Sequence, residues 1–232
     1  MAAFKLCCIH CGADTDQLHH VFCGTLRLRE CGKCGKFVDE LLGVEPMIIG
    51  VKLFLQRKEV YRHFCRNALG DLPLQVPIIL LAIEMFLAWT IYNQAGDFES
   101  TVDEFKWNVV RIITQVLLGW IAHVLTVCVA LRLFSNDFFK MSRIFFIIVV
   151  ASFCNFFNLG VLLWSPPECL EYAAYVVEGC WLLAQYRMLQ CSLEGRPLCS
   201  ALIVSCAAYS KFAASSCDSI SVFVADSLSQ YF

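Results

Sequence analysis

Four cysteines near the start of the chain have the spacing of metal ligands. They form two Cys-x-x-Cys turns, each followed by glycine and separated by nineteen residues: Cys8, Cys11, Cys31 and Cys34. Each turn brings two thiolates together, and its glycine accepts a backbone conformation that other residues resist. Four thiolates close a tetrahedral site with no open position for a substrate. The spacing predicts a structural zinc ion for a segment too short to bury a core alone. The alternative is a set of ordinary thiols in a cysteine-rich chain.

Other possible donors lie beside these turns. Cys7 would give a three-residue spacing with Cys11, and further thiol and imidazole groups lie nearby at Cys23, His10, His19 and His20. Because zinc knuckles usually space their two cysteines by two residues, we expect Cys8 to be the ligand. The other groups are predicted to be non-ligands.

The residues after the second turn carry a family resemblance. An acidic run ending at Pro46 is followed by an apolar segment and a Tyr-Arg-His ending. This succession over about 60 residues resembles the Arv family (ACAT-related proteins required for viability), which starts with paired CxxC turns. The chain departs at Leu41-Leu42-Gly43, where the family has an aromatic-isoleucine-glutamate run, and at Lys52, where a polar or acidic residue is common. The matching residues are Cys8, Cys11, Cys31, Cys34, Val38, Asp39, Pro46, Tyr61, Arg62, His63 and Asn67.

The composition is that of a membrane protein. Apolar residues make up 59% of the 232 residues and charged ones 16%, with a mean hydropathy of +0.64. Soluble domains are about half apolar and a quarter charged. The net charge of −2 gives no reason to expect a nucleic-acid partner. We expect no cleavable signal peptide, because the first thirty residues hold zinc ligands rather than an apolar core.

The first 67 residues divide into two parts. Residues 1–45 are predicted to form a zinc-ribbon module, with a β-hairpin arm where residues 25–30 alternate in polarity. Residues 46–67 are predicted to form an amphipathic helix that opens at Pro46. This helix either lies among lipid headgroups or packs against the module or the membrane helices. In the first case Tyr61, Arg62, His63 and Asn67 are membrane-interface candidates, acting as anchors or in specific lipid recognition.

Residues 68–214 are predicted to form a transmembrane helical domain of about four helices, within a range of three to five. Three apolar runs at 74–92, 112–131 and 144–164 are predicted spans. A weaker fourth runs over 170–188, and residues 198–214 form a fifth span or a re-entrant or surface helix. The tail at 215–232 is predicted to be loosely held. The predicted fold class is an all-α polytopic membrane protein with a small N-terminal zinc ribbon.

Five polar side chains lie inside these apolar runs, where each is a functional candidate. They are Glu84, His123, Asn155, Asn158 and Glu178. For Glu84 we favour a buried carboxyl bonded to a neighbouring helix, and for His123 a packing role. Asn155 and Asn158 share a helical face that should point into the bundle and could line a groove for a lipid. Their spacing matches no catalytic motif, so we expect no enzyme activity.

The distribution of basic residues predicts orientation. Ten of the eighteen Lys and Arg residues precede the first span, the 93–106 loop is acidic, and the 132–143 loop is basic. The zinc module is therefore expected in the cytosol. The family resemblance implies the endoplasmic reticulum membrane, sterol movement, and links to sphingolipid metabolism and glycosylphosphatidylinositol precursor delivery. Expected partners are membrane lipids, including sterol, and lipid-metabolic membrane enzymes. The alternatives are a zinc-ribbon adaptor that scaffolds such enzymes and, less favoured, an enzyme using Glu84, His123 or Glu178.

Overall fold

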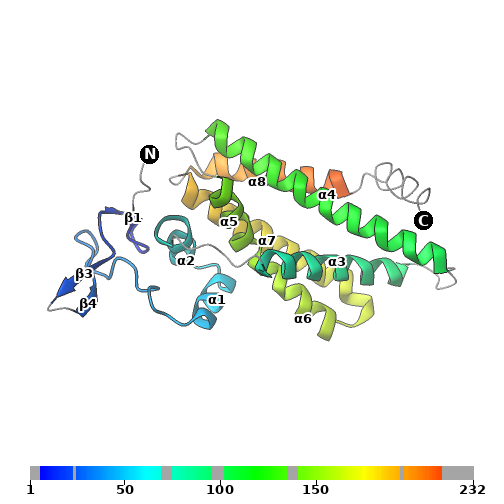
Figure 1. Cartoon of the computed structure of the whole chain (residues 1–232), viewed down its shortest axis with the longest axis horizontal. Coiled ribbons are helices and arrows are strands. Elements are labelled where there is room, and N and C mark those ends of the chain that lie inside the picture. Colours follow the sequence, from blue (N-terminus) through cyan, green and yellow to red (C-terminus); the bar gives the residue numbers. More distant parts are fainter. Residues whose placement is uncertain are drawn as a thin grey trace.

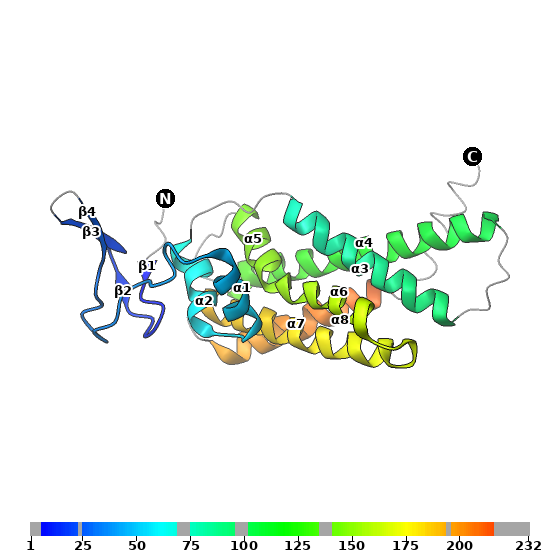
Figure 2. The ribbon, with the colours of Figure 1, turned by 90° about the horizontal axis from the view of Figure 1, so that it is seen from below.

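The computed structural model describes residues 6–22, 25–68, 75–95, 102–134, 141–193 and 196–215. A small strand-containing module lies at one end of a helical bundle, and two short helices lie between them (Figure 1). The same order is seen from below in Figure 2. The predicted tail lies outside the described residues beyond Ser215.

The N-terminal part, residues 6–45, is called the cysteine module below. Its strands form two antiparallel pairs: β1 (Leu6–Cys7) with β2 (Asp14–Thr15), and β3 (His19–Phe22) with β4 (Thr25–Leu28). The second pair confirms the predicted hairpin, which projects away from the helices (Figure 2). Among its described residues, Cys8, Leu18, Cys31 and Val38 form a small buried core of the module's own.

The predicted amphipathic helix over 46–67 is broken. Helix α1 (Pro46–Phe54) starts with proline in its first turn, as expected, and α2 (Lys58–Arg62) continues into a π-helical turn, η1 (His63–Asn67). The break falls at Gln56, whose φ of 54° is uncommon for a residue with a side chain. The side-chain Nε2 of Gln56 donates to Cys154 Sγ at 3.2 Å, and its Oε1 accepts a hydrogen bond from the Tyr61 hydroxyl at 2.8 Å. These tertiary contacts hold a turn that helical periodicity alone does not predict.

The bundle is made of helices of 8 to 33 residues (Figure 1). They are α3 (Gln75–Ala95), α4 (Val102–Phe134), α5 (Met141–Ala151), α6 (Phe157–Trp164), α7 (Leu170–Ser192) and α8 (Pro197–Ser215), with 3₁₀ turns η2 (Ser152–Phe156) and η3 (Pro167–Cys169). Helix α4 starts at Val102, so part of the acidic segment predicted as a loop is helical. The third apolar run is interrupted at η2.

Four described segments are long and apolar enough to cross a membrane: 75–92, 107–134, 144–164 and 197–214. This confirms the expected number and the first three predictions, with a longer second segment. The fourth of these segments is not the one that the sequence favours. Helix α7 forms, but Glu178 and Arg187 leave it less apolar, and the predicted span at 170–188 is not among the four. The fourth candidate span is instead 197–214, for which the sequence allows either a span or a re-entrant or surface helix.

The bundle core surrounds the interrupted helix. Half of the 144–164 segment is buried, against 11% of the 75–92 segment, so the former lies at the centre and the latter at the edge. Two residues of the cysteine module, Ile9 and Leu41, belong to the same apolar cluster as buried residues of α2, α4, α5, α7 and α8. The module is thus packed onto the bundle rather than tethered to it.

Candidate metal centre and buried polar networks

The four predicted ligands converge in the cysteine module. The Sγ atoms of Cys8, Cys11, Cys31 and Cys34 all lie within 4.8 Å of one another. Cys8 Sγ is 3.7 Å from Cys34 Sγ, and Cys11 Sγ is 3.6 Å from Cys31 Sγ. A disulfide would require about 2.05 Å. A tetrahedral ion about 2.3 Å from each sulfur places the sulfurs roughly 3.8 Å apart. The cluster can therefore hold a metal ion, and four thiolates suit zinc.

The two turns repeat one backbone geometry. In each, the amide of the glycine bonds to the carbonyl of the first cysteine at 2.8 Å, as Gly12 to Cys8 and Gly35 to Cys31. Gly12 and Gly35 have φ of +75° and +70°, which explains why glycine follows each pair. This duplication presents four sulfurs from two matching halves, as a tetrahedral site requires.

The thiols differ in how readily they ionise without a metal. Backbone N–H groups of Cys34 and Lys33 lower the pKa of Cys31 to about 6. Burial raises the pKa of Cys8 to about 12, so a bound cation would have to displace its proton. Burial also raises the pKa of Cys7 to about 11.

The predicted non-ligands that the structure describes, Cys7, His10, His19 and His20, contribute no atom to the cluster. Cys23 lies outside the described residues.

A second constellation joins the module to the helices through Asp39, which is fully buried. Asp39 Oδ1 accepts a hydrogen bond from the backbone N–H of Leu41 at 3.0 Å. Its Oδ2 lies 2.7 Å from both His63 Nδ1 and Asn67 Nδ2. Asn67 also bonds to the backbone of Cys7, accepting from its N–H at 3.1 Å and donating to its carbonyl at 2.9 Å. We call these residues the Asp39 network. It clamps β1 and the acidic run onto η1.

These contacts correct the interpretation of the Tyr-Arg-His segment. Tyr61, His63 and Asn67 are 1%, 7% and 5% exposed, so they are internal ties rather than anchors at headgroup depth. Arg62 is half-buried, and its Nη1 donates to the carbonyls of Ile9 at 2.8 Å and His10 at 2.5 Å. The sequence identified Asp39 as part of the family pattern but not as the centre of a network.

The intramembrane candidates largely meet in the bundle. Glu84 Oε1 lies 2.7 Å from Lys211 Nζ, and its Oε2 accepts a 2.6 Å bond from Trp120 Nε1 and a longer one, 3.5 Å, from Asn155 Nδ2. Lys211 also lies 3.6 Å from Glu178 Oε1 and 4.4 Å from the centre of the Trp181 ring. We call Glu84, Trp120, Asn155, Glu178 and Lys211 the Glu84 network. It confirms that Glu84 bonds to neighbouring helices.

The predicted inward face of Asn155 and Asn158 is confirmed, since they are 1% and 4% exposed. Among the residues that the structure describes, several buried polar atoms of the bundle have no hydrogen-bond partner: both ring nitrogens of His123 and the Oδ1 atoms of Asn155 and Asn158. His123 packs on Trp181, with ring centres 4.9 Å apart, but makes no hydrogen bond, so only its packing role is supported. Lys211 was not among the predicted residues. Its signal was a charge opposite to Glu84 in a separate apolar helix.

Comparisons with known proteins agree with the resemblance. A model of the Arv1-like family matches residues 7–182. "Protein ARV 1" of Arabidopsis thaliana is 29% identical over 179 residues, covering 72% of this chain and 71% of that protein. "Protein arv1 homolog" of Dictyostelium discoideum is 22% identical and covers 69% and 74%. "Protein ARV1" of Homo sapiens is 29% identical over 83 residues, or 35% and 31%. No solved structure matches.

Proposed function

Because the chain belongs to the Arv1-like family, we propose that it acts in membrane lipid homeostasis and distributes sterol from the endoplasmic reticulum membrane. Effects on sphingolipid metabolism and on glycosylphosphatidylinositol precursor delivery would follow from altered sterol content or from contacts with lipid-metabolic enzymes. No catalytic step is part of this proposal. The cysteine module would hold structural zinc and face the cytosol, on the side where basic residues concentrate.

The observation that carries this proposal is the outward face of α1. Met47 is 81% exposed, and Ile48, Val51, Phe54 and Leu55 are 47–55% exposed, although all are apolar. On the opposite face Leu53 is buried, and Phe54, at the edge of the exposed face, packs its ring 4.2 Å from that of Phe157. An apolar patch at the end of a membrane bundle suits immersion in the leaflet. There the module would meet sterol as it enters or leaves the bilayer.

The bundle offers a partner for the one polar group of a sterol. A hydroxyl in hydrocarbon needs a hydrogen-bond partner. The Oδ1 atoms of Asn155 and Asn158 are buried acceptors without one, on the interrupted helix that α1 contacts. We propose that a sterol hydroxyl donates to one of them. Glu84 is less suited to this role, because Lys211 and Trp120 already satisfy it.

Photoreactive sterol labelling of the purified, zinc-quantified protein tests the proposal. We expect saturable labelling that unlabelled sterol competes and a 3-deoxy analogue competes at least tenfold less well. Labelling should fall in Asn155→Leu/Asn158→Leu. The metal-free Cys31→Ser/Cys34→Ser variant separates the two regions: lost labelling assigns the module a part in sterol entry, and retained labelling confines the site to the bundle. A zinc-loaded wild type without specific labelling would rule out direct sterol handling.

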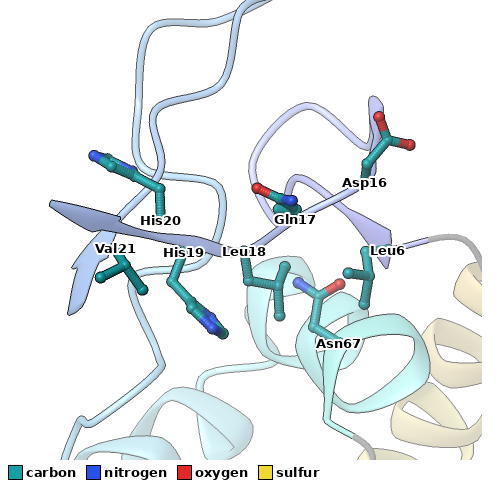
Figure 3. Close-up of a pocket in the computed structure, with 8 residues that line it drawn as sticks. All are labelled: Leu6, Asp16, Gln17, Leu18, His19, His20, Val21 and Asn67. Carbon is teal, nitrogen blue, oxygen red and sulfur yellow. The ribbon is translucent and has the colours of Figure 1, made fainter. Parts of the chain in front are cut away.

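A second candidate is an adaptor that recruits a lipid-metabolic enzyme. A pocket of about 520 Å³ opens where β3 meets η1, and its lining includes His19 and His20, which point to opposite sides of β3 (Figure 3). The hairpin beside it exposes 69% of Val21. A projecting hairpin with a pocket and an exposed apolar side chain is suited to a protein partner. Normal lipid distribution in cells carrying Asn155→Leu/Asn158→Leu, but not in cells carrying Val21→Asp, would favour this function.

A further inference from the structure

A second pocket lies between the cysteine module and the bundle. It has a volume of about 480 Å³, within the range of ligand sites. The first metal-binding turn, the α2–η1 segment and the end of α7 all contribute to it, through residues that include Gly12, Lys58, Arg62, Arg66 and Gln190. We call it the basic pocket. Three cations line it together with one carboxylate, Asp14, and the candidate metal ligand Cys11.

The backbone of α2 and η1 brings the three cations together. Lys58, Arg62 and Arg66 are each four residues apart, close to one helical turn. The wide π turn after Arg62 changes the helical register, and Arg66 still lines the pocket. Such turns in helices often occur at functional sites. The arrangement therefore concentrates positive charge on one face of a short segment.

One arginine is held in place before any ligand arrives. The two carbonyl bonds of Arg62 Nη1 fix the guanidinium over the first turn, where a Cβ on Gly12 would lie 3.7 Å from Arg62 Cζ. A guanidinium has five N–H donors, so the Nε and Nη2 groups remain for a ligand. Within the described part of the chain, exposed Lys58 forms no ion pair that would neutralise it. A fixed guanidinium fork beside an exposed ammonium offers donors suited to a phosphate group.

We propose that the basic pocket binds a phosphate group, carried by a lipid headgroup or by a soluble phosphate ester. The site is separate from the bundle acceptors proposed for sterol, so it does not depend on the sterol proposal. The three cations offer a phosphate group both positive charge and N–H donors. Because α1 exposes its apolar face at the same end of the bundle, a phospholipid could reach the pocket from the leaflet.

The test compares neighbouring cations. Zinc-loaded full-length protein in detergent is titrated with fluorescent phosphatidic acid and with the matched diacylglycerol, which lacks only the phosphate. We expect specific binding of phosphatidic acid alone. Lys58→Gln should weaken it about tenfold, as should Arg66→Gln. Arg57→Gln, which removes an exposed cation outside the pocket, should change it less than twofold.

Competition identifies the source of the phosphate. Displacement by glycerol 3-phosphate at similar concentrations would indicate a soluble ester, and resistance to it would indicate a lipid headgroup. Equal binding of diacylglycerol, or equal losses in Lys58→Gln and Arg57→Gln, would overturn the inference. Zinc content and the unfolding temperature of each variant identify any variant that fails to fold. Lys58→Gln should perturb folding least, because the Lys58 side chain lies at the surface. Sterol labelling of the same samples should not change.

Discussion

The cysteine module holds a fully buried carboxylate, Asp39, and the bundle holds a partly buried one, Glu84, and the two are bonded differently. Both oxygens of Asp39 have partners, and the groups that donate to them are themselves fixed by the backbone or by packing. Around Glu84 the carboxylate is paired, yet acceptors on Asn155 and Asn158 and both nitrogens of His123 have no bond. Complete satisfaction indicates a structural tie. The unpaired groups beside Glu84 are where a ligand or water would gain most.

The largest effect should come from removing the metal site, which tests whether the two regions are separable. Cys31→Ser/Cys34→Ser should lose all bound metal and unfold the module, because structural zinc contributes about 10 kcal/mol or more to small domains. The bundle should keep its helices, since its core is mostly its own. Metal content, limited proteolysis and circular dichroism report these outcomes. Loss of helical signal together with the metal would show that the bundle depends on the module.

Breaking the Asp39 network should have the next largest effect. Asp39→Ala leaves His63, Asn67 and the Leu41 amide without their shared acceptor, at a cost of about 3–5 kcal/mol. Glu40→Ala is the matched control. Glu40 is 44% exposed and forms a surface pair with Lys52, so its loss should cost less than about 1 kcal/mol. Thermal unfolding of both variants decides the point, and similar shifts would contradict a structural role specific to Asp39.

A pair of variants tests whether the Glu84–Lys211 ion pair is a structural tie like the Asp39 network. Glu84→Leu alone should destabilise by about 3 kcal/mol, because Lys211 keeps only its longer contact to Glu178. Glu84→Leu/Lys211→Met removes both charges and should recover most of that loss. Unfolding followed by tryptophan fluorescence measures both. If the double variant is no more stable than the single one, the ion pair does more than hold helices together.

The smallest effect concerns one turn of the metal site. Gly12→Ala should cost about 1 kcal/mol, because φ at this position is +75°. Gly32→Ala is the matched change within a ligand turn, where φ is not in the left-handed region and no atom lies within 4 Å of the added Cβ. It should be close to neutral. Chelator titration of the metal would reveal the difference, and equal affinities would show that glycine is dispensable there.

The sequence predicted what depends on local spacing. The cysteine pairs, the β3–β4 hairpin and the inward face of Asn155 and Asn158 follow from periods of two to four residues, and three spans follow from the length of the apolar runs. It did not predict the break at Gln56, which depends on Tyr61 and Cys154, or the role of Lys211, whose partners lie on two other helices. The sequence offers Tyr61 and His63 as membrane-interface residues, because polarity alone does not show that a side chain is hydrogen-bonded inside the protein.

The position of the Asp39 network in the chain also has a consequence for the order in which the parts fold during synthesis. Every member of the network, and every cysteine of the candidate metal site, lies between Cys7 and Asn67, ahead of the first candidate membrane segment at Gln75. Domains near the N-terminus generally fold first as the chain is made. The module can therefore take up its metal and close onto η1 before any helix enters the bilayer. Helix α7, which supplies Met188 and Ser192 to Cys65, arrives later and meets a surface that is already formed.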